Sequence, residues 1–277
     1  MGTKKKFLQP GTLAAAVIVG CIGYLLACGV IAWLVDFRGI NFLGIGSLLE
    51  SIYPDYPIFW LQMFKEGSVT EVLQWVSLAA AMVLTGKLHL EHRRTQNRVF
   101  PGWFLLMCGL LLMFTEDTVN LRHGLAALIA LGVLGINPFT QQWRASTEKN
   151  LLELGFYGLM ALLMVGSFWY IVRNKMLAAK GKLVLLAGFG FYGAASVASA
   201  TRNIGHWYQQ AGALLLEALG WGERAMWSAD SIVYGRFPLS FYFMDFFVEE
   251  SVELLGAVFL LAAVLIFWGT RQGVKQL

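Results

Sequence analysis

Residues 246–268 read FFVEESVELLGAVFLLAAVLIFW, and this stretch contains the two features that decide the fold. From Leu254 onward it is an uninterrupted apolar run, and the whole stretch is long enough to cross the hydrocarbon core of a bilayer as a helix. Its first third carries Glu249, Glu250 and Glu253. A charge in hydrocarbon costs on the order of 3 kcal/mol unless it is compensated, so these acids are functional candidates.

The rest of the chain has the same apolar character. Its 277 residues are 57% hydrophobic and 14% charged, whereas soluble domains carry about 25% charged residues. The net charge of +4 does not indicate a nucleic-acid partner, because the basic residues lie in short loops. We therefore predict an all-α, polytopic helical bundle forming a single transmembrane domain over residues 1–277. The six predicted spans are 12–35, 69–86, 103–119, 151–172, 183–200 and 246–268.

A seventh apolar run, Gly124–Ile136, has only thirteen residues, so we expect a re-entrant or interfacial helix there. Lys and Arg in the loops then set the orientation, because they accumulate on the cytoplasmic side. One side of the predicted bundle has Glu91 as its only acid. Its thirteen basic residues are Lys4, Lys5, Lys6, Lys87, Arg93, Arg94, Arg98, Arg173, Lys175, Lys180, Lys182, Arg271 and Lys275. We expect this side to be cytoplasmic, with both termini on it, in a bacterial inner membrane.

The other side holds the remaining acids and two longer segments. Residues 37–64 are rich in Tyr, Phe, Trp and Pro and are expected to form an aromatic loop in the membrane interface. Residues 211–227 are expected to form an amphipathic surface helix. Together these segments are predicted to cover the outer ends of the spans.

Two helical hairpins, residues 66–123 and 148–206, have the pattern of an internal repeat. Residues 118–123 and 201–206 both read T-x-N-x-x-H, and the pairs Glu66/Glu71 and Glu148/Glu153 are each five residues apart. Span six, which opens with Asp245 and Glu250, resembles a third half-copy. Duplicated hairpins tend to pack about a pseudo-two-fold axis, with sites at the repeat interface.

The acids and histidines at the outer ends of the spans are the candidate site. Helical bundles bind paired iron or manganese ions with glutamates and histidines from facing helices, so two Fe, Mn or Zn ions are the predicted cofactors. The predicted metal ligands are Glu71, Glu116, His123, Glu153, His206, Glu250 and Glu253. The residues expected to orient these ligands are Asp117, Asn120, Arg122, Arg202, Asn203 and Glu249. The usual Glu-x-x-His motif is absent, and no catalytic residue is assigned.

Simpler interpretations of the same residues remain open. A histidine at the end of a span is often an interface residue, and acids near a helix N-terminus are favoured by its dipole. Glu116 and Asp117 lie at a predicted helix C-terminus, where an ion pair to Arg122 or Arg202 would account for them. Asn120 and Asn203 are also typical of hydrogen bonding between packed helices.

Lys65–Gln74, read with Phe114–His123, resembles uncharacterised bacterial multipass inner-membrane proteins that have acidic span ends. In that family an acidic E-D-G-x-x-E-x-L-Q opening precedes a span that contains G-E-E. Here E-G replaces E-D-G and T-E-D replaces G-E-E. The resemblance implies a membrane location and no function.

Three functions fit these observations. The first is a membrane-embedded, metal-dependent oxidoreductase or hydrolase acting on a lipid-like substrate near the periplasmic face. The second is a non-catalytic subunit whose acidic outer face docks a basic periplasmic partner such as a cytochrome. The third is a proton- or cation-coupled transporter, which the scarcity of charge in the inner halves of the spans disfavours.

Overall fold

The computed structural model describes residues 9–96, 100–138, 140, 147–202, 204–221 and 227–274, and its side-chain detail excludes positions 96, 147, 148, 150 and 271–274. In these parts the regular secondary structure is helical except for one short antiparallel hairpin. The elements are α1 (Pro10–Ala32), η1 (Trp33–Phe37), η2 (Phe42–Gly44), α2 (Ile45–Ile52), α3 (Phe59–Phe64), α4 (Val69–Gln96), α5 (Pro101–Val119), α6 (Leu121–Gly132), α8 (Thr147–Arg173), α9 (Ala179–Thr201), α10 (Trp207–Ala218), β1 (Ile232–Val233), β2 (Phe237–Pro238), α11 (Leu239–Tyr242), η4 (Phe243–Glu249) and α12 (Glu250–Val274).

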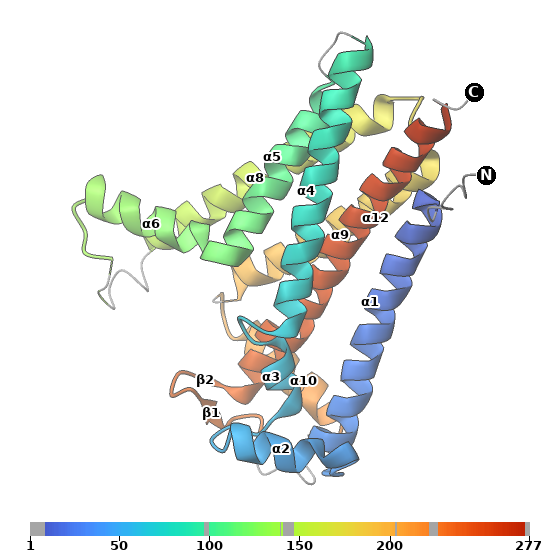
Figure 1. Ribbon diagram of the computed structural model, residues 1–277. Helices are drawn as coiled ribbons and strands as arrows, with labels where there is room; N and C mark the ends of the chain where they lie inside the picture. Colours follow the sequence, from blue (N-terminus) through green and yellow to red (C-terminus); the bar gives the residue numbers. More distant parts are fainter. Residues whose placement is uncertain are drawn as a thin grey trace. The chain divides into compact units, whose positions relative to one another are not determined.

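Within the described ranges, six helical segments are long and apolar enough to cross a membrane, as the sequence predicted (Figure 1). Many of their large apolar side chains are exposed, among them Val19, Leu162 and Val165. Such a surface is stable in lipid and not in water, which marks the chain as a multipass membrane protein. The segments are Pro10–Phe37, Phe59–Thr95, Pro101–Val119, Leu151–Arg173, Ala179–Thr201 and Leu239–Thr270.

The structure also corrects two expected boundaries. Helices α2 and α3 occupy much of residues 37–64, which were expected to form an aromatic loop. The last segment begins at Leu239, directly after the extended residue Pro238, instead of at 246. Its acids therefore lie inside a continuous helical segment, beyond the first turn where the helix dipole favours them. The short apolar helix α6 has 12 residues, too few to span a bilayer.

The chain divides into two compact units, and the division falls within α1, α4, α9 and α12. Unit 1 comprises Met1–Ile18, Trp75–Gly193 and Gly256–Leu277, and unit 2 comprises Val19–Gln74 and Ala194–Leu255. The expectation that residues 1–277 form a single transmembrane domain stays a prediction. The internal repeat also stays a prediction.

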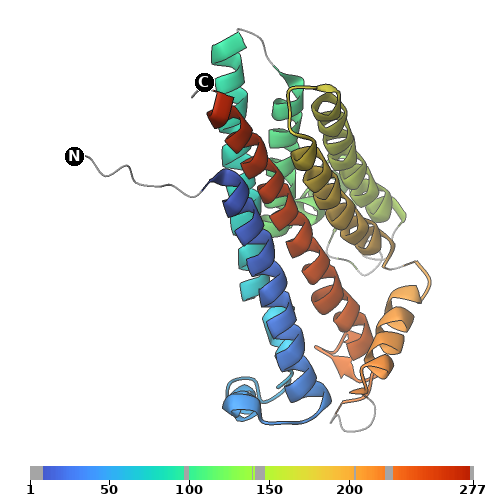
Figure 2. The same ribbon diagram turned by 90° about the vertical axis from the view of Figure 1, so that its right-hand side faces the viewer.

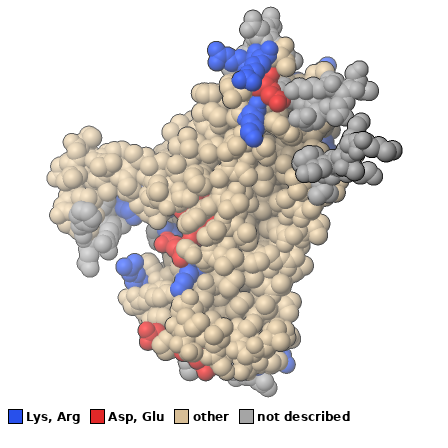
Figure 3. Space-filling model, viewed as in Figure 1, with Lys and Arg blue, Asp and Glu red and all other residues tan. Residues whose placement is uncertain are grey.

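Unit 1 is held together by close helix packing. Helices α5 and α8 lie side by side in both views, and the beginning of α8 also contacts α6 (Figures 1 and 2). In the same unit Gly256 of α12 faces α9, where an added Cβ would lie 2.8 Å from the amide nitrogen of Tyr192. A small residue such as Gly256 allows the two helix backbones to come close together. In membrane proteins the dispersion forces between closely packed helices stabilise such contacts. Basic side chains gather at the C-terminal end of α4, whose last turn contains Arg93 and Arg94 (Figure 3).

Unit 2 has an aromatic core. Trp60 and Phe64 of α3 pack with Tyr208 of α10 and Phe243 of η4, and all four are almost completely buried. Leu216 belongs to the same core, so the two segments expected to cover the outer span ends share it. Helix α10 comes so close to α11 that a Cβ on Gly212 would lie 1.9 Å from the Ser240 carbonyl oxygen.

Candidate functional site

Glu116 and Arg122 form a buried ion pair that joins α5 to α6. The Arg122 Nε lies 3.2 Å from Glu116 Oε1, and the Arg122 backbone amide donates to Glu116 Oε2 at 2.6 Å. Between the helices Asn120 has a left-handed backbone, with φ of 52°. Asparagine tolerates this conformation better than most residues. Glu116 thus holds the first turn of α6, and the ion pair to Arg122 anticipated from the sequence is confirmed.

His123 belongs to the same network. Its Nδ1 lies 2.7 Å from Glu153 Oε1 on α8, and its Nε2 lies 3.3 Å from an Arg122 nitrogen. Lys149 also reaches Glu153, at 3.3 Å, and the Arg122 guanidinium lies over the Tyr157 ring. This network links α6 to α8. The Glu153 carboxylate already has two cations near it, Lys149 and Arg122.

Asp117 has a different partner. The hydroxyl of Tyr192 on α9 donates to its carboxylate, at 2.8 and 2.9 Å from the two oxygens. All residues of this network and of the Asp117 contact belong to unit 1.

In unit 2 the acids Asp245, Glu249 and Glu253 recur every four residues, and we call this set the acidic ladder. Each acid has a polar partner on another element. The partners are Arg202, just after α9, for Asp245 (2.6 Å); Tyr208 of α10 for Glu249; and Gln74 of α4 for Glu253 (2.9 Å). Asp245 and Glu249 lie in the π-helical turn η4, a type of turn that is frequent at functional sites.

The surroundings of Arg202 and Tyr208 fix their protonation states. Burial lowers the pKa of Arg202, but the nearby charges of Asp245 and Glu249 outweigh this effect and raise it above its ordinary value. Burial, and then the charge of Glu249, raise the pKa of Tyr208. Arg202 is therefore a permanent cation, and Tyr208 remains a hydrogen-bond donor at neutral pH.

Glu71 acts as a helix cap. Its carboxylate accepts a hydrogen bond from the backbone amide of Gly67, and Ser68 Oγ lies 3.5 Å from the Glu71 amide nitrogen at the start of α4. Ser68-Val-Thr-Glu71 has the S-x-x-E spacing of a capping box, a signal that was readable in the sequence.

The remaining predicted residues are placed as follows. His206 is exposed at the start of α10, Glu250 is half-buried beside Glu249, and Asn203 and the side chain of Glu148 lie outside the described part of the chain. The predicted ligands thus fall into two sets: Glu116, His123 and Glu153 in unit 1, and Glu71, His206, Glu250 and Glu253 in unit 2. Within the described residues, no three His, Cys, Asp or Glu side chains are grouped so that they would hold one metal ion. The metal site stays a prediction.

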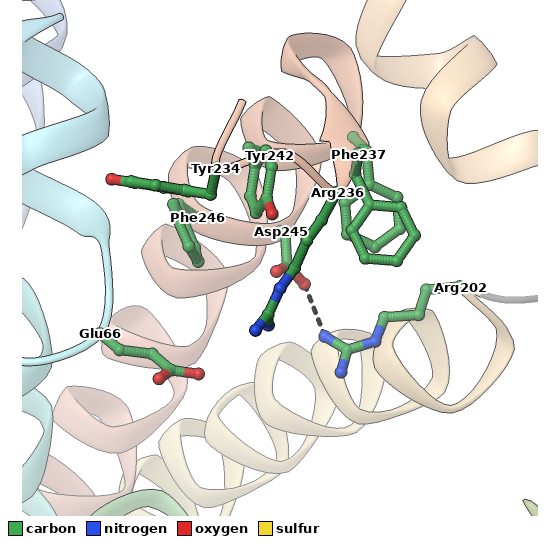
Figure 4. Close-up of a pocket in the computed structure, with 9 residues that line it drawn as sticks. Glu66, Arg202, Tyr234, Arg236, Phe237, Tyr242, Asp245 and Phe246 are labelled. Atoms are coloured by element: carbon green, nitrogen blue, oxygen red, sulfur yellow. Dashed lines mark hydrogen bonds and ion pairs between the residues drawn. The ribbon is translucent and has the colours of Figure 1, made fainter. Parts of the chain in front are cut away.

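A pocket of about 470 Å³ lies beside the first acid of the ladder in unit 2 (Figure 4). We call it the aromatic pocket. One side has the ion pair of Arg202 with Asp245, and Arg236 and Glu66 also point into it (Figure 4). Its residues are Glu66, Arg202, Tyr234, Arg236, Phe237, Phe241, Tyr242, Asp245 and Phe246.

Several of these functional candidates were not found from the sequence. Tyr208 and Gln74 give no sequence signal, because their partners are distant in the chain. Asp36 was also missed, although its carboxylate accepts from the amides of Phe59 (2.8 Å) and Trp60 (3.0 Å) at the start of α3. An acid at the end of an apolar span was the available signal for Asp36.

Comparisons of the chain with protein families, with curated proteins and with solved structures found no match.

Proposed function

We propose that this membrane protein binds a lipid-like molecule in the aromatic pocket, with the polar head of the ligand beside Arg202, Asp245 and Arg236. The observation that supports this proposal is the composition of the pocket, which combines charged groups with five aromatic side chains. Its volume of about 470 Å³ is in the range of small-molecule sites, roughly 300–1,000 Å³. A lipid head group and its glycerol fit such a volume, while the acyl chains would remain in the bilayer.

The location of the pocket in the chain agrees with a ligand taken from one leaflet. The pocket residues lie around the beginning of the last membrane-spanning segment, Leu239–Thr270, in the chain that precedes α4 and α11, and directly after α9. Under the orientation proposed from the basic loops, this end of the segment faces the periplasm.

Lipid binding is tested on protein extracted into nanodiscs with its native lipids and examined by native mass spectrometry. Phe237→Ala removes a pocket side chain that is 40% exposed, and Phe104→Ala removes a matched side chain, 47% exposed, from α5. We expect the first variant to lose bound lipid several-fold and the second to keep it. Equal retention by both variants would overturn the proposal.

The metal-dependent reaction predicted from the sequence has its own test. Elemental analysis of the purified protein, with a His123→Ala, His206→Ala double variant as control, measures whether Fe, Mn or Zn is held in stoichiometric amount. If the wild type holds stoichiometric metal and the double variant does not, the supported function is a metal-dependent reaction on a lipid-like substrate. Wild-type protein without stoichiometric metal would remove that function and leave lipid binding in place.

The acidic ladder favours proton or cation transport as a second candidate function. The first and last acids of the ladder are eight positions apart in one helical segment, which corresponds to a rise of about 12 Å. Close carboxylates raise one another's pKa and suit proton exchange. In proteoliposomes with a pH-sensitive dye, Glu249→Gln should abolish transport, while Glu217→Gln, on exposed surface, should not. No transport by the wild type would eliminate this candidate.

Docking of a basic partner on an acidic face is less favoured by the geometry. That function requires acids that face outward. Glu71, Glu116 and Glu249 are instead buried and hydrogen-bonded within the chain, and the exposed acids include Glu50, Asp55 and Glu217.

A further inference from the structure

Two of the charged side chains in the aromatic pocket, one cation and one anion, form no ion pair within the described residues. Four charged side chains line it, and Arg202 and Asp245 form an ion pair at 2.6 Å. The other two are Arg236 and Glu66, both exposed. Among the described residues, neither forms an ion pair with another side chain. One cation and one anion in the pocket are therefore available to a ligand.

These two residues are positioned by separate elements. Glu66 lies in the turn between α3 and α4, and Arg236 lies in the turn between β1 and β2. Figure 4 shows the two side chains entering the pocket from different sides. A ligand that neutralises both charges therefore carries an anionic and a cationic group at separate positions.

The β1–β2 turn is held in an uncommon conformation. Tyr234 has φ of 53°, which is rare for a bulky residue and needs support from its surroundings. Here the Tyr56 hydroxyl accepts a hydrogen bond from the Tyr234 amide at 3.1 Å, and the two rings lie 4.9 Å apart. The Arg236 amide also donates to the Val233 carbonyl at 3.2 Å, which closes the turn. Gly235, with φ of 64°, is the second central residue of this turn, and two consecutive positive-φ residues are the usual geometry of a tight β-hairpin turn. The turn places Arg236 at the pocket.

The chemistry of the two side chains defines the ligand. A guanidinium binds a phosphate through two parallel hydrogen bonds, and Arg is preferred for this geometry. A carboxylate accepts hydrogen bonds from a primary ammonium group, which a quaternary ammonium cannot donate. The Tyr242 and Phe246 rings add an apolar wall that also attracts a cation through its π-electrons.

We infer that the aromatic pocket selects a zwitterion that carries a phosphate and a primary ammonium, the phosphate on Arg236 and the ammonium on Glu66. This assignment rests on the proposed lipid binding and names the head group that is bound. Two sources carry this chemistry, a phosphatidylethanolamine in the membrane and soluble phosphoethanolamine. An anionic head such as phosphatidylglycerol would place no cation beside Glu66.

The test uses full-length protein in nanodiscs that contain equal amounts of phosphatidylethanolamine, phosphatidylcholine and phosphatidylglycerol. Native mass spectrometry then measures which lipid remains bound. We expect the wild type to retain phosphatidylethanolamine several-fold over the other two. Glu66→Gln should lose the preference over phosphatidylglycerol, and Arg236→Gln should lose binding of all three. Glu50→Gln and Arg38→Gln, at exposed positions outside the pocket, should behave as the wild type.

The outcomes separate this inference from the proposed function. If Phe237→Ala reduces total bound lipid but Glu66→Gln keeps the wild-type preference, the pocket binds lipid and the zwitterion assignment is wrong. If Phe237→Ala changes nothing, the proposed function fails. Competition with soluble phosphoethanolamine identifies the source of the ligand. If phosphoethanolamine displaces the lipid and this displacement requires Glu66, the pocket recognises the head group alone. If the preference for phosphatidylethanolamine requires Glu66 but phosphoethanolamine displaces no lipid, the ligand is the phospholipid.

Discussion

Arg122 is a buried cation whose main counter-charge is one acid, Glu116. The Glu116 carboxylate supplies the counter-charge at 3.2 Å and the acceptor for the Arg122 amide, and both side chains are almost fully buried. Breaking one partner of a buried pair costs about 3–5 kcal/mol, because the other charge remains without compensation. The Glu153 carboxylate is shared among His123 and Lys149 and compensates Arg122 only in part.

We therefore expect Glu116→Gln to destabilise the protein by about 3 kcal/mol. The glutamine oxygen can still accept a hydrogen bond from the Arg122 amide, but its NH2 group would then face the guanidinium, so the loss would measure the charge together with one acceptor. Thermal unfolding in detergent, followed by tryptophan fluorescence, measures the effect. Glu50→Gln, on exposed α2, is the control and should leave the transition unchanged. A Glu116→Gln transition equal to that of the wild type would show that Arg122 is hydrated.

Tyr208 predicts a dependence of stability on pH. Its pKa is raised by burial and by the charge of Glu249, so the folded protein keeps the phenol proton where the unfolded chain loses it. This contribution is complete below about pH 10, the ordinary pKa of tyrosine, and decreases as the pH rises further. The midpoint of thermal unfolding should fall between pH 9 and 11 more steeply in the wild type than in Tyr208→Phe. Identical slopes would contradict the prediction, and Tyr170→Phe, on exposed surface, is the control.

At the scale of elements, the contact of α10 with α11 depends on the absence of a side chain at Gly212. A Cβ there would lie 1.9 Å from the Ser240 carbonyl oxygen, which belongs to the backbone and cannot rotate away. Gly212→Ala should therefore separate the helices and destabilise the protein by about 1–3 kcal/mol or more. Gly158→Ala, on α8 with nothing within 4 Å, should instead be neutral or stabilising, because alanine favours the helix. Thermal unfolding of both variants measures the difference, and equal midpoints would contradict it.

The elements also show what the sequence is able to predict. Apolar run length identified all six spans, because bilayer thickness limits helix length independently of packing. It placed the start of the last segment at 246 instead of Leu239, since aromatic and polar residues around Asp245 resembled an interface. The partners Gln74 and Tyr208 had no local pattern, because three-dimensional packing alone brings them to Glu253 and Glu249. The sequence thus singled out the acids as functional candidates, but their assignment as metal ligands stays a prediction and their hydrogen-bond partners were not found.

At the scale of the whole molecule, the clearest prediction is the orientation in the membrane. The basic loops predict that both termini are cytoplasmic, and under this orientation α2 is expected to face the periplasm. In a variant with Cys21, Cys28 and Cys108 replaced by alanine, we expect Glu50→Cys on α2 to react with an impermeant maleimide in intact cells whose outer membrane is opened. Lys175→Cys, in the turn between α8 and α9, should react only after the inner membrane is permeabilised. Both positions are exposed, so accessibility from one side alone should decide the reaction. The reverse labelling pattern would show that the orientation is opposite to the predicted one. The aromatic pocket would then lie on the cytoplasmic side, and its ligand would come from the other leaflet.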